Sequence, residues 1–172
     1  MDREKENGLM WTRLVLEVYN KLPKMAKTFE KAGDTLVKSS LTSGRYGSGY
    51  TTEELFEKMI ELNYRKTGII NLKVLTDQSL RRIETSVANV LKARFFLKLD
   101  YATIAQKENT TQRTVFRKVE RGIEKLYECF AFFGFTASRF EREYADEPLI
   151  QREKSILLEK MSNEKQDYSK SS

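Results

Sequence analysis

The chain has 172 residues, enough to bury a hydrophobic core as one domain or as a small domain with appendages. Hydrophobic residues make up 40% of it and charged residues 33%, with eight Gly and two Pro, a balance typical of helices that keep one face in water. The lone Cys129 excludes an intramolecular disulfide, and the absence of histidine removes the commonest metal ligand and general base. We therefore expect an all-α protein that is not an enzyme and binds no cofactor or metal ion.

The formal net charge is +6, and the excess of positive charge is concentrated in one segment. Between Lys92 and Lys125, nine basic residues stand against four acidic ones, a net charge of +5. Such a segment favours a nucleic acid partner, although an ordinary solvated helix surface also explains it. The first residues lack the apolar core of a signal peptide and no stretch is apolar enough to span a membrane, so we expect a cytoplasmic protein without membrane contact.

A helical region is predicted over residues 1–76. Apolar residues recur at helical spacing over Met10–Phe29, interrupted by Pro23, which predicts a kink or two helices that meet at Leu22. Gly33 is expected to end the second helix, and residues 35–41 add a short helical turn.

A flexible Gly-rich loop is expected over residues 42–50. Thr51 and Glu54 then have the spacing of a capping box, so the next helix starts there. This helix either continues to Leu75 or breaks at Gly68.

A DNA-binding region is predicted over residues 77–135. Thr76 or Asp77 is expected to cap its first helix. The buried face of that helix is predicted to be Leu80, Ile83, Val87, Val90, Leu91 and Phe95.

Residues 101–126 have the order of residue types that a helix-turn-helix requires. Asp100 is expected to cap a short first helix that buries Ile104 and Ala105. Glu108–Thr110 form the turn, in which Asn109 tolerates a left-handed backbone, and Thr111 caps the second helix.

The second helix is predicted to be unusually long. Its inward side chains are Val115, Val119, Ile123 and Leu126, and the same face continues to Phe133, after which Gly134 provides a C-terminal cap. The aromatic cluster of Phe130, Phe132, Phe133 and Phe135 is expected to pack as core against the N-terminal helices, in preference to forming an exposed partner surface.

The outward side chains of this helix suit the major groove of DNA. The candidate base-reading residues are Thr111, Gln112, Arg113, Phe116 and Arg117. The candidate phosphate contacts are Lys107, Lys118 and Arg121. The alternative is that the arginines only solubilise the helix.

Two further helices are expected over residues 136–161. The first runs from about Thr136 to Ala145, and the second opens with Pro148 and reaches Met161. Residues 162–172 are polar and are expected to form a disordered tail.

The pattern Tyr101-x-x-Ile-Ala-x₈-Thr-Val-x-Arg-x-Val-x-Arg-x-Ile-Glu-Lys-Leu126 resembles region 4 of sigma-70-type factors, and the resemblance covers residues 80–127. It implies a helix-turn-helix that recognises a promoter element. Glu108 and Thr110 depart from the family pattern, since apolar residues are usual at these positions. The segment Glu53–Lys66 is similar in character to the upstream helix of small phage-type regulators of Gram-positive bacteria, of the ArpU/RinA kind.

These observations favour a sequence-specific transcription regulator that binds double-stranded DNA. A sigma-like subunit that also contacts RNA polymerase is one alternative, and a helical protein-interaction module without DNA binding is another. A homodimer is left open by the sequence.

Overall fold

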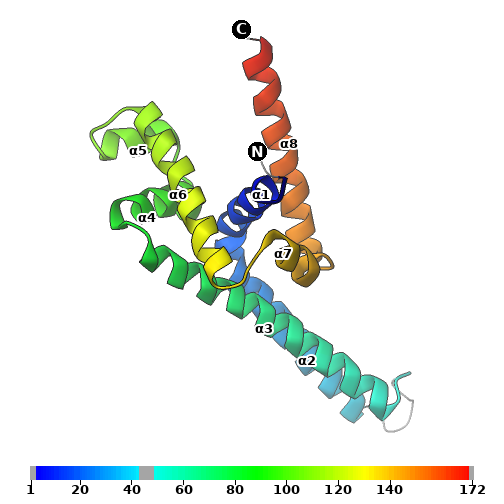
Figure 1. The fold of residues 1–172 in the computed structure, drawn as a ribbon. Helices are drawn as coiled ribbons and strands as arrows, with labels where there is room; N and C mark the ends of the chain where they lie inside the picture. The colour runs from blue at the N-terminus through cyan, green and yellow to red at the C-terminus, as the bar shows by residue number, and fades with distance from the viewer. Residues whose placement is uncertain (1–2, 43–48, 171–172) are drawn as a thin grey trace. The chain divides into compact units, whose positions relative to one another are not determined.

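The protein is all-helical. A computed structural model describes residues 3–42 and 49–170, with side chains as far as Ser162, and this part of the chain contains helices and no strand (Figure 1). The chain divides into two compact units, one made of residues 1–19 and 75–172 and the other of residues 20–74. Residues 1–19 therefore group with the C-terminal part of the chain. This differs from the predicted division, in which residues 1–76 form one helical region.

The unit of residues 20–74 is a helical hairpin. Its first helix, α2 (Leu22–Thr42), follows a 3₁₀ turn, η1 (Tyr19–Lys21), and Pro23 stands in the first turn of α2, where its missing amide costs nothing. Two helices therefore meet at Leu22, as predicted. The prediction that Gly33 ends the second helix is wrong, because Leu36 and Val37 remain half-buried and α2 continues to Thr42.

The loop predicted over residues 42–50 falls mainly outside the described residues. Thr42 is the last residue of α2, and residues 43–48 are not described. Gly49 has a φ of 71°, a left-handed conformation that glycine adopts without strain.

The second helix of the hairpin, α3 (Thr52–Arg82), starts at the predicted capping box. The Thr51 amide donates to Glu54 Oε2 at 2.7 Å, and the Glu54 amide donates to Thr51 Oγ1 at 3.2 Å. The helix passes through Gly68 without a break.

The predicted cap at Thr76 or Asp77 is wrong, because α3 continues through both residues to Arg82. Thr76 is fully buried, and Asp77 accepts a hydrogen bond of 2.5 Å from the Tyr19 hydroxyl. The side chain of Asp77 is therefore used for tertiary packing, and the helix ends more than a turn later, before Glu84.

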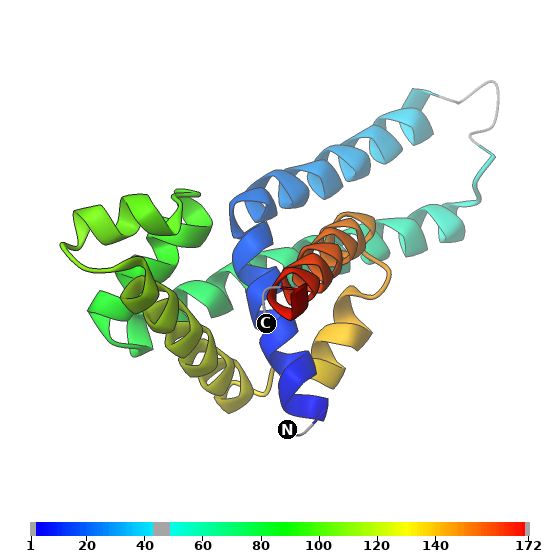
Figure 2. The same cartoon turned by 90° about the horizontal axis from the view of Figure 1, so that it is seen from above.

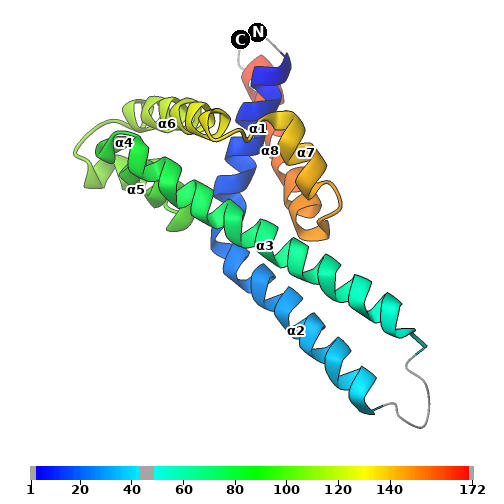
Figure 3. The ribbon, with the colours of Figure 1, turned by 60° about the horizontal axis from the view of Figure 1, so that its bottom comes forward.

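In the other unit, α1 (Arg3–Val18) lies between two groups of helices. On one side are α4 (Thr85–Leu91), the π-helical turn η2 (Lys92–Phe96), α5 (Tyr101–Lys107) and α6 (Gln112–Phe132); on the other are α7 (Ala137–Tyr144) and α8 (Pro148–Lys170). The views in Figures 2 and 3 show the same arrangement, with α1 in blue between green-yellow and orange-red helices. α1 contacts α6, α7 and α8 and so joins the two groups.

The core of this unit is apolar and contains a cluster of aromatic rings. The side chains that are 2% exposed or less include Trp11, Leu14, Val15, Leu16, Leu91, Ile104, Val119, Ile123, Leu126, Phe130, Phe140 and Ile150. Trp11 stacks on Phe140 with ring centroids 5.6 Å apart, and its indole N–H donates to Glu141 Oε1 at 2.9 Å. The buried indole thus has the polar partner that it requires.

Only part of the predicted aromatic cluster is core. Phe130 is fully buried, and Phe130 and Phe135 pack on Phe140 with centroid distances of 5.7 and 5.5 Å. Phe132 is 72% exposed and, like Phe133, lies against the guanidinium of Arg82. Successive residues of a helix point to different sides, so one helix end cannot bury all four rings.

The C-terminal helices begin where the sequence predicts. Thr136 caps α7 by accepting a hydrogen bond from the Arg139 amide, and Pro148 is the first residue of α8. However, α8 continues to Lys170, past Ser162 where the disordered tail was expected. No helix in the described ranges is long and apolar enough to cross a membrane.

Candidate nucleic-acid interface

The first helix of the predicted motif, α5, is short and firmly capped. The Asp100 carboxylate accepts a hydrogen bond of 2.7 Å from the Thr103 amide. Ile104 and Ala105 are 2% and 5% exposed, and α5 packs on α6. The small Ala105 side chain permits this close crossing of the two helices.

The turn between α5 and α6 has the predicted left-handed residue. Asn109 has a φ of 49°, and the Thr110 amide bonds to the Ala105 carbonyl at 2.9 Å. The Asn109 amide bonds to the Gln106 carbonyl at 3.3 Å, which completes a Schellman motif. Thr111 then caps α6 by accepting from the Thr114 amide at 3.2 Å. Four residues thus end one helix and start the next.

The polar residues of this turn are accommodated by exposure to water. Glu108 and Thr110, at which the chain departs from the sigma pattern, are both exposed. Neither side chain occupies a core position, so their polarity has no desolvation cost.

The inner face of α6 lies against three helices, α1, α4 and α5. Val115, Val119, Ile123 and Leu126 are at most 1% exposed, as predicted. At Gly122 the α4 side chains come so close that a Cβ atom would lie 2.8 Å from Val87 Cγ1 and 3.0 Å from Leu91 Cδ1. Glycine is therefore required for α4 and α6 to approach this closely. The helix ends as predicted, with Gly134 at a φ of 78°.

The outer face of α6 carries a row of exposed arginines. Arg113, Arg117 and Arg121 follow one another at intervals of four residues and so share one side of the helix. None of them has an ion-pair partner among the described residues. Gln112 precedes the row in the first turn, and Lys107 is exposed at the end of α5. The arginine row and Lys107 therefore carry positive charges that form no ion pair among the described residues.

Two carboxylates of the motif are paired with other side chains. Glu108 Oε2 accepts from Lys118 Nζ at 3.0 Å, and Glu120 accepts from the guanidinium of Arg13 in α1. Lys118, a candidate phosphate contact, thus has a protein partner already. The pairing with Arg13 neutralises one acidic neighbour of the arginine row, and the exposed Glu124 follows one turn later in α6.

Phe116 and Thr111 are the two candidate base contacts that also take part in local structure. Phe116 is 47% exposed, and its ring meets Tyr101 edge-on at a centroid distance of 5.8 Å. Arg94 lies over the other ring, 4.9 Å from the Tyr101 centroid, and donates to the Leu99 carbonyl. The Thr111 hydroxyl is shared between the cap of α6 and the hydroxyl of Thr114.

Arg13 and Arg94 support the motif but are not evident from its sequence. Arg13 lies 107 residues before Glu120, and no local pattern connects the two. Arg94 is a basic residue shortly before the motif in the sequence. Its closeness to Tyr101, the first residue of α5, is the signal that could have indicated its supporting role.

Hydrogen bonding holds the carboxyl group of Asp100 in its charged form. The bonds from Thr103 lower the pKa of Asp100 below its ordinary value of 3.8, and the charge of Arg94 acts in the same direction, while desolvation opposes them. The N-terminal cap of α5 is therefore charged at neutral pH.

No family model, curated protein or solved structure matches this chain. The interface is thus defined by its own geometry and charge.

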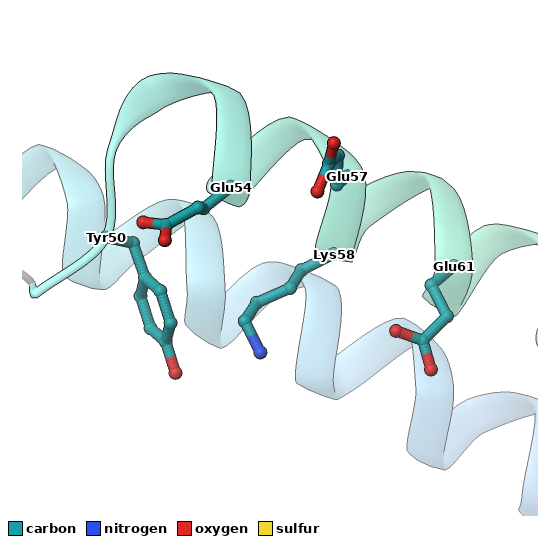
Figure 4. A pocket seen from close by; sticks show the side chains of 5 residues that line it. All are labelled: Tyr50, Glu54, Glu57, Lys58 and Glu61. Atoms are coloured by element: carbon teal, nitrogen blue, oxygen red, sulfur yellow. The ribbon is translucent and has the colours of Figure 1, made fainter.

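The described residues form two surface hollows, one that contains no residue of the arginine row and one that includes Arg121, the last member of the row. One, in the hairpin unit, is formed by Tyr50, Glu54, Glu57, Lys58 and Glu61 (Figure 4). Its three carboxylates repel phosphate, and no cluster with the ligands for a metal ion is present in the described part of the chain.

The other hollow lies beside α6 and has a volume of about 370 Å³. It is lined by Arg82, Ile83, Glu84, Val87, Arg121, Lys125, Glu128 and Cys129. Lys125 is paired with Glu128 at 2.8 Å, and desolvation raises the pKa of the Cys129 thiol. The thiol is thus kept protonated and weakly nucleophilic.

Proposed function

We propose that the chain is a sequence-specific transcription regulator that binds double-stranded DNA with α5 and α6 as a sigma-region-4-like helix-turn-helix. The observation that carries the proposal is the row of Arg113, Arg117 and Arg121, which is exposed, has no ion-pair partner in the described part of the chain and lies on a helix whose opposite face is buried. A charged row without protein partners suits an anionic partner, and the N-terminus of α6 adds its own partial positive charge.

The geometry supports separate roles along the helix. Gln112 and Arg113 stand in the first turn of α6, which is the part that enters the major groove in such motifs. Gln112 can form paired hydrogen bonds to adenine, and Arg113 or Arg117 to guanine, each worth roughly 1–3 kcal/mol of discrimination. Lys107 and Arg121 lie further from the first turn and suit phosphates, which position the protein without specifying sequence.

Selection from random duplexes followed by fluorescence anisotropy tests the proposal. The wild type is expected to enrich one duplex and to bind it with a strong dependence on salt. The double variant Arg113→Ala, Arg117→Ala should lose the preference for that duplex over a scrambled one. As a matched control, Arg142→Ala, Arg152→Ala removes the same charge from exposed positions of α7 and α8 and should keep the preference. Absence of duplex binding by the wild type at low salt would disprove DNA binding.

A further inference from the structure

One face of the hairpin helix α3 is used for packing against α2. The guanidinium of Arg65 lies 4.6 Å from the centroid of the Phe29 ring, and Lys66 Nζ lies 3.3 Å from Glu30 Oε1. These contacts join the middle of α3 to the first half of α2. An apolar residue on the opposite face of α3 points away from these contacts with α2.

That opposite face carries a regular apolar seam. Its members are Phe56, Ile60, Asn63, Thr67, Ile70 and Val74, which we call the α3 seam. All six are exposed, and the four apolar ones are between 44% and 66% exposed. The intervals along the seam alternate between four and three residues, the spacing of the a and d positions of a coiled coil. An exposed apolar stripe with this spacing is the usual form of a helix–helix interface.

The order of residues along the seam is symmetric about Arg65. Two apolar residues, two polar residues and two apolar residues follow one another, and each member has a counterpart at the same distance on the other side of position 65. In an antiparallel pair of identical helices, a positions face d positions of the other chain. A second copy would therefore place Phe56 opposite Val74 and Ile60 opposite Ile70, with Asn63 opposite the hydroxyl of Thr67. The seam is thus complementary to itself in the antiparallel direction.

Charge along α3 favours the same direction. Residues 52–64 contain four glutamates and one lysine, a net charge of −3, and residues 65–74 contain Arg65, Lys66 and Lys73 without an acidic residue, a net charge of +3. The glutamates of the first half include the three in the hollow of Figure 4. An antiparallel second copy brings the acidic half of each helix nearer to the basic half of the other, an attraction along the length of the helices, since Arg65 and Lys66 themselves contact α2 on the face opposite the seam. A parallel copy would place like charges together.

We propose that the α3 seam is a homodimer interface, in which two copies of this chain pair antiparallel about Arg65. Tyr64, which is 69% exposed and flanks the centre of the seam, lies against Tyr64 of the second copy. The seam shares no residue with α5 or α6, so dimerisation and DNA binding can be measured independently. It is isologous, since the same residues of both copies make it.

Sedimentation equilibrium over a concentration series tests the interface. The wild type should sediment as a dimer, and Ile60→Lys should raise the dimer Kd by at least about 100-fold, because two unpaired ammonium groups would enter the apolar seam. Leu41→Lys, at an exposed apolar position of α2 outside the seam, is the matched control and should leave the Kd unchanged. Circular dichroism confirms that each variant remains helical. A monomeric wild type, or a dimer that Ile60→Lys leaves intact, would overturn the proposal.

Mixing two variants tests the direction of pairing. Ile60→Lys and Ile70→Glu should each be monomeric alone. Mixed together they should form a heterodimer, because antiparallel pairing sets the introduced ammonium group of one chain opposite the introduced carboxylate of the other. The same pairing leaves Ile70 of the first chain opposite Ile60 of the second, so one apolar layer is restored. A parallel dimer offers no such pair, since position 60 then faces position 60. Failure of the mixture to dimerise would overturn the antiparallel arrangement.

Discussion

Arg13 of α1 forms an ion pair with Glu120 of α6, and both side chains are partly shielded from water. The pair joins the first helix of the chain to the outer side of the helix that carries the arginine row. It also neutralises the carboxylate nearest to that row on the α1 side. One contact thus contributes both to the fold and to the charge of the candidate interface.

Removal of this ion pair should lower stability modestly. Arg13→Ala is expected to reduce the free energy of unfolding by about 0.5–1 kcal/mol, because the pair is only partly buried and water screens it. Urea unfolding of Arg13→Ala, Glu120→Gln and the double variant measures the coupling between them. The fully surface pair Lys125–Glu128 provides the comparison and should show a smaller coupling. Additive effects of Arg13→Ala and Glu120→Gln would contradict a direct interaction.

The close approach at Gly122 predicts a larger effect on stability. Gly122→Ala should destabilise the protein by about 1–3 kcal/mol, because its Cβ would overlap the side chains of Val87 and Leu91, which are fixed in the core. Gly33→Ala is the control: no atom lies within 4 Å of the added Cβ, and alanine in a helix should stabilise by about 0.5–1 kcal/mol. Thermal unfolding followed by circular dichroism measures both. Equal effects of the two substitutions would show that packing at Gly122 is not tight.

The cap of α5 should make this helix sensitive to acid. Hydrogen bonds from Thr103 lower the pKa of Asp100 in the folded state, so its stabilising contribution is present above the ordinary value of 3.8 and is lost as the pH falls through the folded pKa. NMR should show the Thr103 amide shift titrating with the Asp100 carboxyl below pH 3.8. In Asp100→Asn the amide cap remains but this titration should disappear. A titration of Thr103 that survives the substitution would assign it to another group.

Features that depend on neighbouring residues could be predicted from the sequence. At the caps, the side chains of Asp100 and Thr111 bond to backbone amides three residues later. The left-handed conformation of Asn109 depends on that one residue. The outline of the candidate interface was predictable for the same reason, since the arginine row lies on one helix.

Features that depend on distant residues could not be predicted. Asp77 resembles a helix cap locally, but the Tyr19 hydroxyl, 58 residues earlier, bonds to its carboxylate, and α3 continues past it. The pairing of Glu120 with Arg13 is equally non-local. The exposed α3 seam also requires the structure, because sequence spacing alone does not show which apolar face of α3 is covered by α2.

Base contacts and phosphate contacts should differ in how their loss affects DNA binding. Lys107→Ala and Arg121→Ala are each expected to weaken binding to the selected duplex and to a scrambled duplex by similar factors. Each should reduce the slope of log K against log salt by about 0.9, because one phosphate contact is lost. Arg113→Ala should instead weaken binding to the selected duplex more than to the scrambled one, by about 1–3 kcal/mol. Fluorescence anisotropy at several salt concentrations distinguishes the two classes, with Arg142→Ala as the charge-matched control. A loss of sequence preference in Arg121→Ala would show that Arg121 contacts bases and not phosphates. In that case more than the first turns of α6 would enter the major groove.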